Sequence, residues 1–224
     1  MTFRVRLYSA ALAAVLLVQP GNAMSQTSSG SLLHQAAERG NIAALQQLIG
    51  SGTPLDSRDN AGRTPLLAAV ASNQLEAAKL LIESGANINA QADNKDSPWL
   101  LAGALGHADM LKLMIPKGPD FSLRNRFGGN ALIPACERGH VEAVEVLLTT
   151  KIDVNHVNNL GWTCLLEIVI LGDGGPRHVE ITRRVLAAGA NPNIADNDKV
   201  TPLTHAKRKG QRAVADLIEA AGGM

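Results

Sequence analysis

Apolar positions after residue 30 recur in short stretches with the spacing of amphipathic helices. In one such stretch Leu75, Ala78, Leu81 and Ile82 fall on a single helical face. These stretches come in pairs joined by a short turn that contains Gly or Asn, and a polar segment follows each pair. The pattern predicts a chain of helix–turn–helix units with no substantial β-sheet.

The units recur with a 33-residue period, and its clearest marker is Thr64-Pro65-Leu66. Equal steps of one period from this marker reach Ser31-Leu32-Leu33, Ser97-Pro98-Trp99, Asn130-Ala131-Leu132 and Thr163-Cys164-Leu165. The next copy, Thr201-Pro202-Leu203, comes late, so the fifth unit holds a five-residue insertion at 173–177. A hydroxyl residue followed by Pro marks the start of a helix. The hydroxyl accepts a hydrogen bond from a free backbone N–H of the first turn, and Pro has no N–H group that would need a partner there.

A second motif, Gly-Ala-Asn-x-Asn, recurs at 85–89 and 189–193. With the Thr-Pro-Leu marker, and with His34 in the slot that follows it, the sequence resembles the ankyrin repeat and its Thr-Pro-Leu-His-x-Ala signature. The resemblance implies an all-α ankyrin-repeat solenoid of about six helix–turn–helix repeats over residues 31–224, in which neighbouring repeats share one core. It is specific for the fold and almost silent about activity.

Three residues refine this expectation. Pro134 falls in the first turn of a first helix and Pro116 near the end of a second helix, so we expect local distortion at both. Trp99 occupies the slot of a buried Leu, which predicts a core ring.

The segment 1–23 differs from the repeats. Two arginines precede an apolar run over residues 10–18, and Pro20 and Gly21 follow it as helix breakers. This is the layout of a secretory signal peptide over 1–23 with cleavage before Met24, and a retained anchor is the alternative. The run is shorter than the roughly 20 residues that span a bilayer. We therefore expect a flexible lead-in over 24–30 and a periplasmic or secreted mature chain without a transmembrane segment.

Charge narrows the class of partner. The chain has 21 basic and 20 acidic residues, whereas nucleic-acid binding calls for a basic stripe. Only Lys207-Arg208-Lys209 comes close, and at the end of the solenoid it is expected to be a solvated cap. We expect a protein partner and no nucleic acid.

Residues suited to catalysis or metal binding are few. His107, His140 and His178 occupy equivalent turns, but stacked helices lie roughly 8–10 Å apart, whereas zinc ligands converge to about 2 Å from one ion. We expect turn-stabilising hydrogen bonds from them, with no metal and no cofactor. The region from Glu167 to His178 admits three interpretations: a lengthened turn, a contact loop, or a catalytic cluster of acids, a base and a cation. We take the first, and we expect no enzyme.

Cys136 and Cys164 would form a disulfide by the usual rule for exported proteins. Cys164 starts a first helix, while Cys136 lies about one and a half turns into the preceding first helix, an axial offset of roughly 7 Å. With the lateral offset added, the Cα atoms would lie beyond the range of about 4.4–6.8 Å that a disulfide needs. The expectation is therefore two buried free thiols.

In ankyrin proteins the turn tips and the ends of the first helices line a concave face, so the resemblance implies a partner-binding groove there. Phe127 and Trp162 fall on adjacent tips, where exposed rings would mark an interaction site, unless the tips fold inward and bury them. The candidate partner-binding residues are Arg63, Asp96, Leu105, Arg126, Phe127, Arg138, Leu160, Trp162, Ile170 and Leu171.

The expected function is that of an exported module that binds a partner protein through this groove. The alternative is a receptor for a small ligand or short peptide that uses the insertion loop of the fifth repeat.

Overall fold

The computed structural model of the chain describes residues 28–224, where twelve α-helices follow one another without a strand. The first helices of the six pairs are α1 Ser29–Arg39, α3 Pro65–Ala71, α5 Pro98–Leu105, α7 Leu132–Glu137, α9 Cys164–Ile170 and α11 Pro202–Arg208. The second helices are α2 Ile42–Gly50, α4 Leu75–Glu83, α6 Ala108–Met114, α8 Val141–Leu148, α10 Pro176–Ala187 and α12 Arg212–Ala220. The predicted helix pairs are confirmed. The predicted signal peptide lies outside the described residues, and α1 takes in the last two residues of the expected lead-in.

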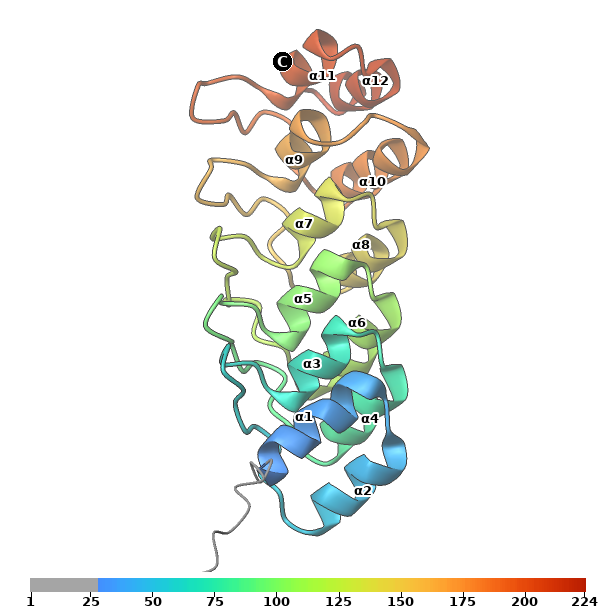
Figure 1. Cartoon of the computed structure of the whole chain (residues 1–224). Helices are drawn as coiled ribbons and strands as arrows, with labels where there is room; N and C mark the ends of the chain where they lie inside the picture. The colour runs from blue at the N-terminus through green and yellow to red at the C-terminus, as the bar shows by residue number, and fades with distance from the viewer. Residues whose placement is uncertain (1–27) are drawn as a thin grey trace, which may run out of the picture.

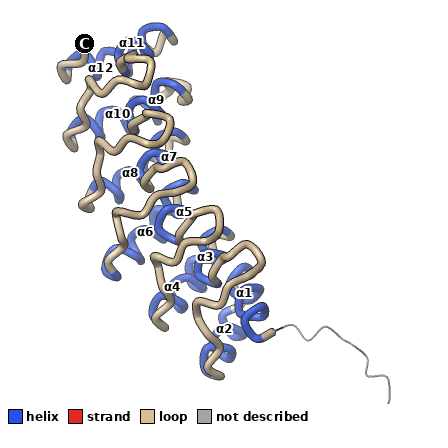
Figure 2. The backbone as a smooth tube through the Cα atoms, turned by 90° about the vertical axis from the view of Figure 1, so that its left-hand side faces the viewer, coloured by secondary structure: helices blue, strands red, loops and turns tan. Residues whose placement is uncertain are grey.

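The pairs stack into an elongated solenoid (Figures 1 and 2). First helices form one layer, second helices form another, and the polar segments between pairs project to one side as a row of loops (Figure 1). Helix packing runs from each pair to the next, as between α3 and α5 or α4 and α6. Each pair thus buries its apolar face against its neighbours, as expected of a repeat protein. No helix of the described range is long and apolar enough to cross a membrane.

The start of each first helix follows the capping signals in the sequence. Thr64, Ser97, Thr163 and Thr201 each accept a hydrogen bond from the backbone N–H three residues ahead. The fourth repeat has no hydroxyl, and there Asn130 Oδ1 accepts from the N–H groups of two residues instead.

The two unusual prolines distort their helices as predicted. Pro134 sits in α7, which at six residues is the shortest first helix. Pro116 lies in the 3₁₀ turn Ile115–Lys117 that ends α6. A proline cannot donate to the helical ladder, so both helices are locally tightened or shortened.

Small and aliphatic side chains fill a continuous core. Ala69, Ala102 and Ala135, at one position of successive first helices, are fully buried and let the helices approach closely. Trp99 is 1% exposed, and its ring meets the edge of Phe121 with centroids 5.6 Å apart. The prediction of a core ring is confirmed.

The loop before each first helix from α3 onward is a tight hairpin, which we call a finger. The fingers before α7 and α9 comprise residues 125–129 and 158–162, each closed by a backbone hydrogen bond between its end residues. The side chain at the base of each, Asn125 or Asn158, accepts two N–H groups of its own finger. A further bond, from Asn159 N to Phe127 O at 2.9 Å, joins the two fingers. These bonds fix the shape of the two fingers.

The prediction of free thiols is wrong. Cys136 and Cys164 form a disulfide, with Cα atoms 5.6 Å apart. The sequence estimate treated neighbouring first helices as parallel and level. In the structure the last turn of α7 meets the first residue of α9, so the axial offset does not separate the two cysteines.

The insertion of the fifth repeat lengthens both a turn and a helix. The turn between α9 and α10 covers residues 171–175, compared with 138–140 in the preceding repeat. The longer turn is confirmed, while the extension of α10 to 12 residues, the longest helix in the described range, was not predicted.

Candidate partner-binding groove

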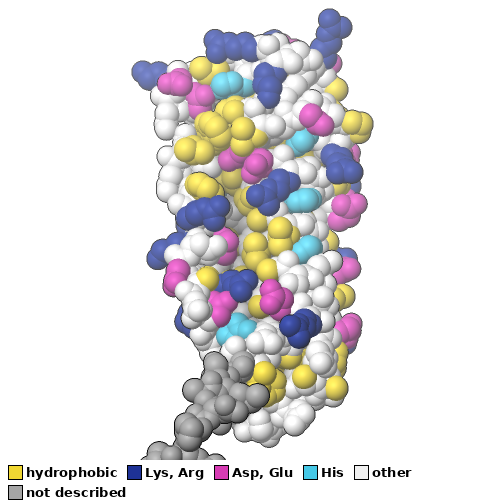
Figure 3. All heavy atoms as spheres, in the orientation of Figure 1, with side chains coloured by type: hydrophobic (Ala, Val, Ile, Leu, Met, Phe, Trp, Pro, Cys, Tyr) yellow, Lys and Arg dark blue, Asp and Glu magenta, His cyan; other side chains and the backbone are white. Residues whose placement is uncertain are grey.

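The fingers and the first helices together form one face of the solenoid, which we call the groove face. Figure 3 shows this face, with a group of hydrophobic side chains where the fingers meet the first helices of the later repeats. Phe127, Leu160 and Leu171 are 51%, 49% and 52% exposed. These are high values for large apolar side chains that lie near one another, and contiguous apolar exposure marks interaction surfaces.

The three side chains surround a cavity of about 340 Å³, which we call the Phe127 pocket. The finger before α7 and α7 itself supply one wall, and the finger before α9, α9 and its C-terminal cap supply the other. The lining residues are Asn125, Arg126, Phe127, Gly129, Ile133, Pro134, Glu137, Arg138, Asn158, Leu160, Glu167 and Leu171.

Five of the ten candidate partner-binding residues therefore meet in one place: Arg126, Phe127, Arg138, Leu160 and Leu171. The other five do not line the pocket.

Trp162 and Ile170 are only partly exposed, so the inward-folding alternative holds in part for Trp162 but not for Phe127. Arg63, Asp96 and Leu105 lie in earlier repeats, and Arg63 is paired with Asp59 at 2.7 Å.

The cationic residues of the pocket are held by contacts of their own. The guanidinium of Arg126 lies 4.6 Å from the ring centroid of Phe127, a contact that contributes roughly 0.5–1 kcal/mol at an exposed site. Arg138 donates to the backbone oxygen of Ala104 at 2.7 Å. Both side chains are exposed, so solvent and salt screen their charges.

The acidic residue Glu167 lines the pocket from within α9, with only 5% of its surface exposed. Asn158 Nδ2 donates to Glu167 Oε1 at 3.0 Å, and Asn158 Oδ1 already accepts two finger N–H groups, so its amide has one orientation. Oε2 has no hydrogen-bond partner among the described residues. Burial, together with repulsion from Glu137, raises the pKa of Glu167 to about 7, against the hydrogen bond from Asn158.

Sequence reasoning missed this role of Glu167, because it assigned the residue to the insertion. The sequence did contain a signal for this role, namely the position of Glu167 within the repeat. Glu167 occupies the variable position of the Thr-Pro-Leu-His-x-Ala signature, where the three preceding repeats carry the uncharged Ala68, Leu101 and Pro134.

The side chains of the insertion region do not form one cluster. His178 Nδ1 bonds to Asp173 Oδ1 at 2.7 Å, and His178 Nε2 bonds to the backbone oxygen of Glu137 at 3.0 Å. These are turn-stabilising contacts of the kind predicted for the turn histidines. Glu167 bonds to Asn158 instead, and Arg177 is exposed. Between residues 28 and 224 no three His, Cys, Asp or Glu side chains are placed to share a metal ion.

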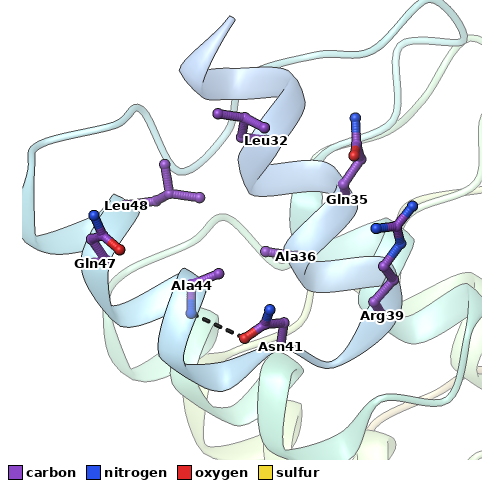
Figure 4. Close-up of a pocket in the computed structure, with 8 residues that line it drawn as sticks. All are labelled: Leu32, Gln35, Ala36, Arg39, Asn41, Ala44, Gln47 and Leu48. Atoms are coloured by element: carbon purple, nitrogen blue, oxygen red, sulfur yellow. Dashed lines mark hydrogen bonds between the residues drawn. The ribbon is translucent and has the colours of Figure 1, made fainter. Parts of the chain in front are cut away.

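A second hollow, of about 300 Å³, lies between α1 and α2 at the N-terminal end of the described solenoid (Figure 4). Leu32, Ala36 and Leu48 are among the residues that line it, beside the polar Gln35 and Arg39. All of its lining residues come from the first repeat, so it is the end of the stack rather than a site between repeats.

The structure is a helical-repeat scaffold with a partly apolar cavity between two repeats. A sequence model of the ankyrin repeats (3 copies) matches residues 6–92 and 99–196. The chain therefore belongs to the ankyrin repeat family, whose domains generally mediate protein–protein interactions and are typically not enzymes.

Two solved structures of the family are similar to most of the chain, and a curated relative is similar to a third of it. An ankyrin repeat domain from Acinetobacter baumannii AYE is 46% identical, with a TM-score of 0.83 over 86% of this chain and 98% of that one. The ankyrin repeat protein EF0377 is 36% identical, with a TM-score of 0.82 and the same coverage. The putative ankyrin repeat protein YahD of Escherichia coli (strain K12) is 42% identical over 73 residues, which span 33% of this chain and 36% of YahD.

Proposed function

We propose that the chain is an exported interaction module that binds a partner protein on its groove face, centred on the Phe127 pocket. The observation that carries the proposal is the meeting of Phe127, Leu160 and Leu171, each about half exposed, around one cavity between two rigid fingers. Aromatic anchors of this kind supply most of the free energy in protein interfaces. Fixed fingers also lower the entropy lost on binding.

Export is supported by the Cys136–Cys164 disulfide, because disulfides persist in oxidising compartments and are rare in the cytosol. The signal-peptide layout of residues 1–23 points in the same direction. We propose the periplasm or the extracellular medium as the site of action.

The small-ligand alternative at the insertion loop has less support. Asp173 and His178 are already bonded to one another, and the hollow beside them is about 190 Å³. This is below the roughly 300–1,000 Å³ usual for ligand pockets.

The test begins with cross-linking and affinity purification of the mature chain from its native compartment, followed by calorimetry with the purified partner. Phe127→Ala is expected to weaken binding roughly 30-fold, since an aromatic hot spot contributes about 2 kcal/mol. Val157→Ala is the matched control, because Val157 is 42% exposed but does not line the pocket. Full affinity of Phe127→Ala for a stoichiometric protein partner would overturn the assignment of this site.

A further inference from the structure

The pocket contains a polar group that the fold leaves unused. Glu167 Oε2 is buried without a hydrogen-bond partner in the described chain, and a buried carboxyl in that state is costly. A second carboxyl, that of Glu137, lines the same cavity. Neither Glu137 nor Glu167 belongs to an ion pair among the described residues.

We propose that the Phe127 pocket binds an arginine side chain of the partner protein. Its hydrocarbon stem would lie along Phe127, Leu160 and Leu171, and its guanidinium would donate to the carboxylates of Glu137 and Glu167. This inference rests on the proposed function and specifies the chemical group that the site recognises.

The form of the cavity matches such a side chain. Arginine packs its methylene groups on apolar surface while its charged head seeks a polar partner, and here an apolar mouth leads to the acidic Glu167. A guanidinium carries five donors in a planar fork, enough to serve two carboxylates at once. Oε2 is buried in the structure, so binding of the guanidinium requires the side chains that cover this atom to move.

A cation suits the site better than a neutral donor. The two carboxylates repel each other, which contributes to the raised pKa of Glu167. A neutral donor would satisfy Oε2 and leave this repulsion in place, whereas a guanidinium between the carboxylates removes both costs.

The surrounding charges do not cancel this preference. Arg126 and Arg138 line the pocket, but both are exposed and held by Phe127 and by the Ala104 carbonyl, so their repulsion is screened. The charged and titratable groups brought to α9 by the helices packed on it are themselves engaged. Lys209 of α11 donates to the Ile170 carbonyl at 2.7 Å.

The remaining groups of these neighbouring helices are also paired or turned to solvent. His205 pairs with Asp196, and His178 pairs with Asp173. Glu180 and Arg184 pair with each other, Arg183 is bonded to Glu180, Lys207 to Glu219, and Arg177 and Arg208 are exposed. None of them neutralises Glu167.

The experiment is an NMR titration of the mature protein with N-acetyl-arginine methylamide, with the citrulline analogue as a neutral probe of the same shape. The arginine probe is expected to shift the Phe127 ring signals and the carboxyl signal of Glu167 at millimolar concentrations. The citrulline probe should bind at least roughly 10-fold more weakly, the usual effect of losing a charged hydrogen bond. Bound arginine should also lower the pKa of Glu167, because a cation favours the carboxylate.

Three variants complete the test. Glu167→Gln and Glu137→Gln should each weaken the arginine probe, while Glu76→Gln, on the exposed side of α4, should leave it unchanged. If Glu167→Gln fails to fold, Glu137→Gln and the pKa of Glu167 in the wild-type protein give the result. Equal binding of the two probes, or an unchanged Glu167 pKa at saturation, would overturn the proposal.

The failure of this inference differs from failure of the proposed function. If arginine and citrulline bind alike but Phe127→Ala abolishes capture of the protein partner, the proposed binding site is supported and the proposal of arginine specificity is wrong. If the arginine probe binds as expected but the partner tolerates Phe127→Ala, the pocket stands as an arginine site and the partner docks elsewhere.

Discussion

Loss of the Cys136–Cys164 disulfide should divide the solenoid into two cooperative blocks. The bond joins α7 to α9 across 28 residues of sequence, and it crosses the boundary between the fourth and fifth repeats. For a loop of that length the chain-entropy relation gives a stabilisation of about 3.5 kcal/mol at 25 °C. Both cysteines are buried, so a change to alanine also removes a buried sulfur, and the packing cost adds to the loss of the cross-link.

The position of the disulfide determines which helices lose stability when the bond is removed. In a repeat protein each repeat depends on its neighbours, so α9 to α12 can unfold while α1 to α8 stay folded. The disulfide holds that boundary closed. The double variant Cys136→Ala with Cys164→Ala should therefore unfold in two steps, with the C-terminal block opening first.

Urea unfolding followed by circular dichroism measures the stability, and hydrogen exchange resolved by mass spectrometry locates the loss. Exchange should quicken over α9–α12 and change little over α3–α5. Each single cysteine variant also lacks the bond and should behave like the double variant, which separates the effect of the cross-link from that of packing. A single transition within about 0.5 kcal/mol of the wild type, the usual range of a neutral surface substitution, would refute this reasoning.

Three further predictions concern export, the core and Glu167. The mature protein recovered from the periplasm or medium should begin at Met24, and Edman or mass-spectrometric sequencing that finds Met1 there would contradict this. Trp99→Ala should cost about 3–5 kcal/mol of folding free energy, since the ring is buried, while Phe127→Ala should cost far less; equal losses in denaturant titrations would mean that both rings are structural. The raised pKa of Glu167, about 7 against 4.5, means that the folded state favours its protonated form, so this residue makes the protein less stable as pH rises from about 4.5 to 7. Between pH 5 and 8, wild-type stability should fall relative to Glu167→Gln by about 1–3 kcal/mol, whereas Glu76→Gln should follow the wild type; parallel curves for wild type and Glu167→Gln would show that the pKa is not raised.

Local signals in the sequence were sufficient for the helices. Thr64 and Ser97 each cap a helix through a bond to a residue three positions ahead, so the sequence alone contains the whole interaction. The 33-residue period then indicates which helices are neighbours.

The disulfide was beyond that reasoning because it depends on how two neighbouring helices are tilted and displaced. Neither quantity follows from the period. In the structure the Cα atoms of Cys136 and Cys164 lie 5.6 Å apart, although their slots in the repeat suggest a larger distance.

The candidate site was predicted in part for the same reason. Phe127 and Leu160 were found because finger tips are exposed in any repeat of this kind. Glu167 was missed because its environment comes from elsewhere in the chain, namely Asn158 at the finger base and Glu137 in the preceding repeat. Trp162 lies outside the pocket and is partly exposed, and its part in binding stays a prediction.

The pairing of Asn158 with Glu167 has a counterpart one repeat later, where Asp196 at the finger base binds His205 in the same variable slot at 2.7 Å. In that repeat the Asp196 carboxylate meets an imidazole, whereas the uncharged Asn158 leaves the Glu167 carboxyl without an ionic partner. In these two repeats the finger-base residue and the variable-slot residue therefore set the local charge between neighbouring fingers. Substitutions at these positions would change the charge of the groove face, and therefore the partners that it favours, one repeat at a time.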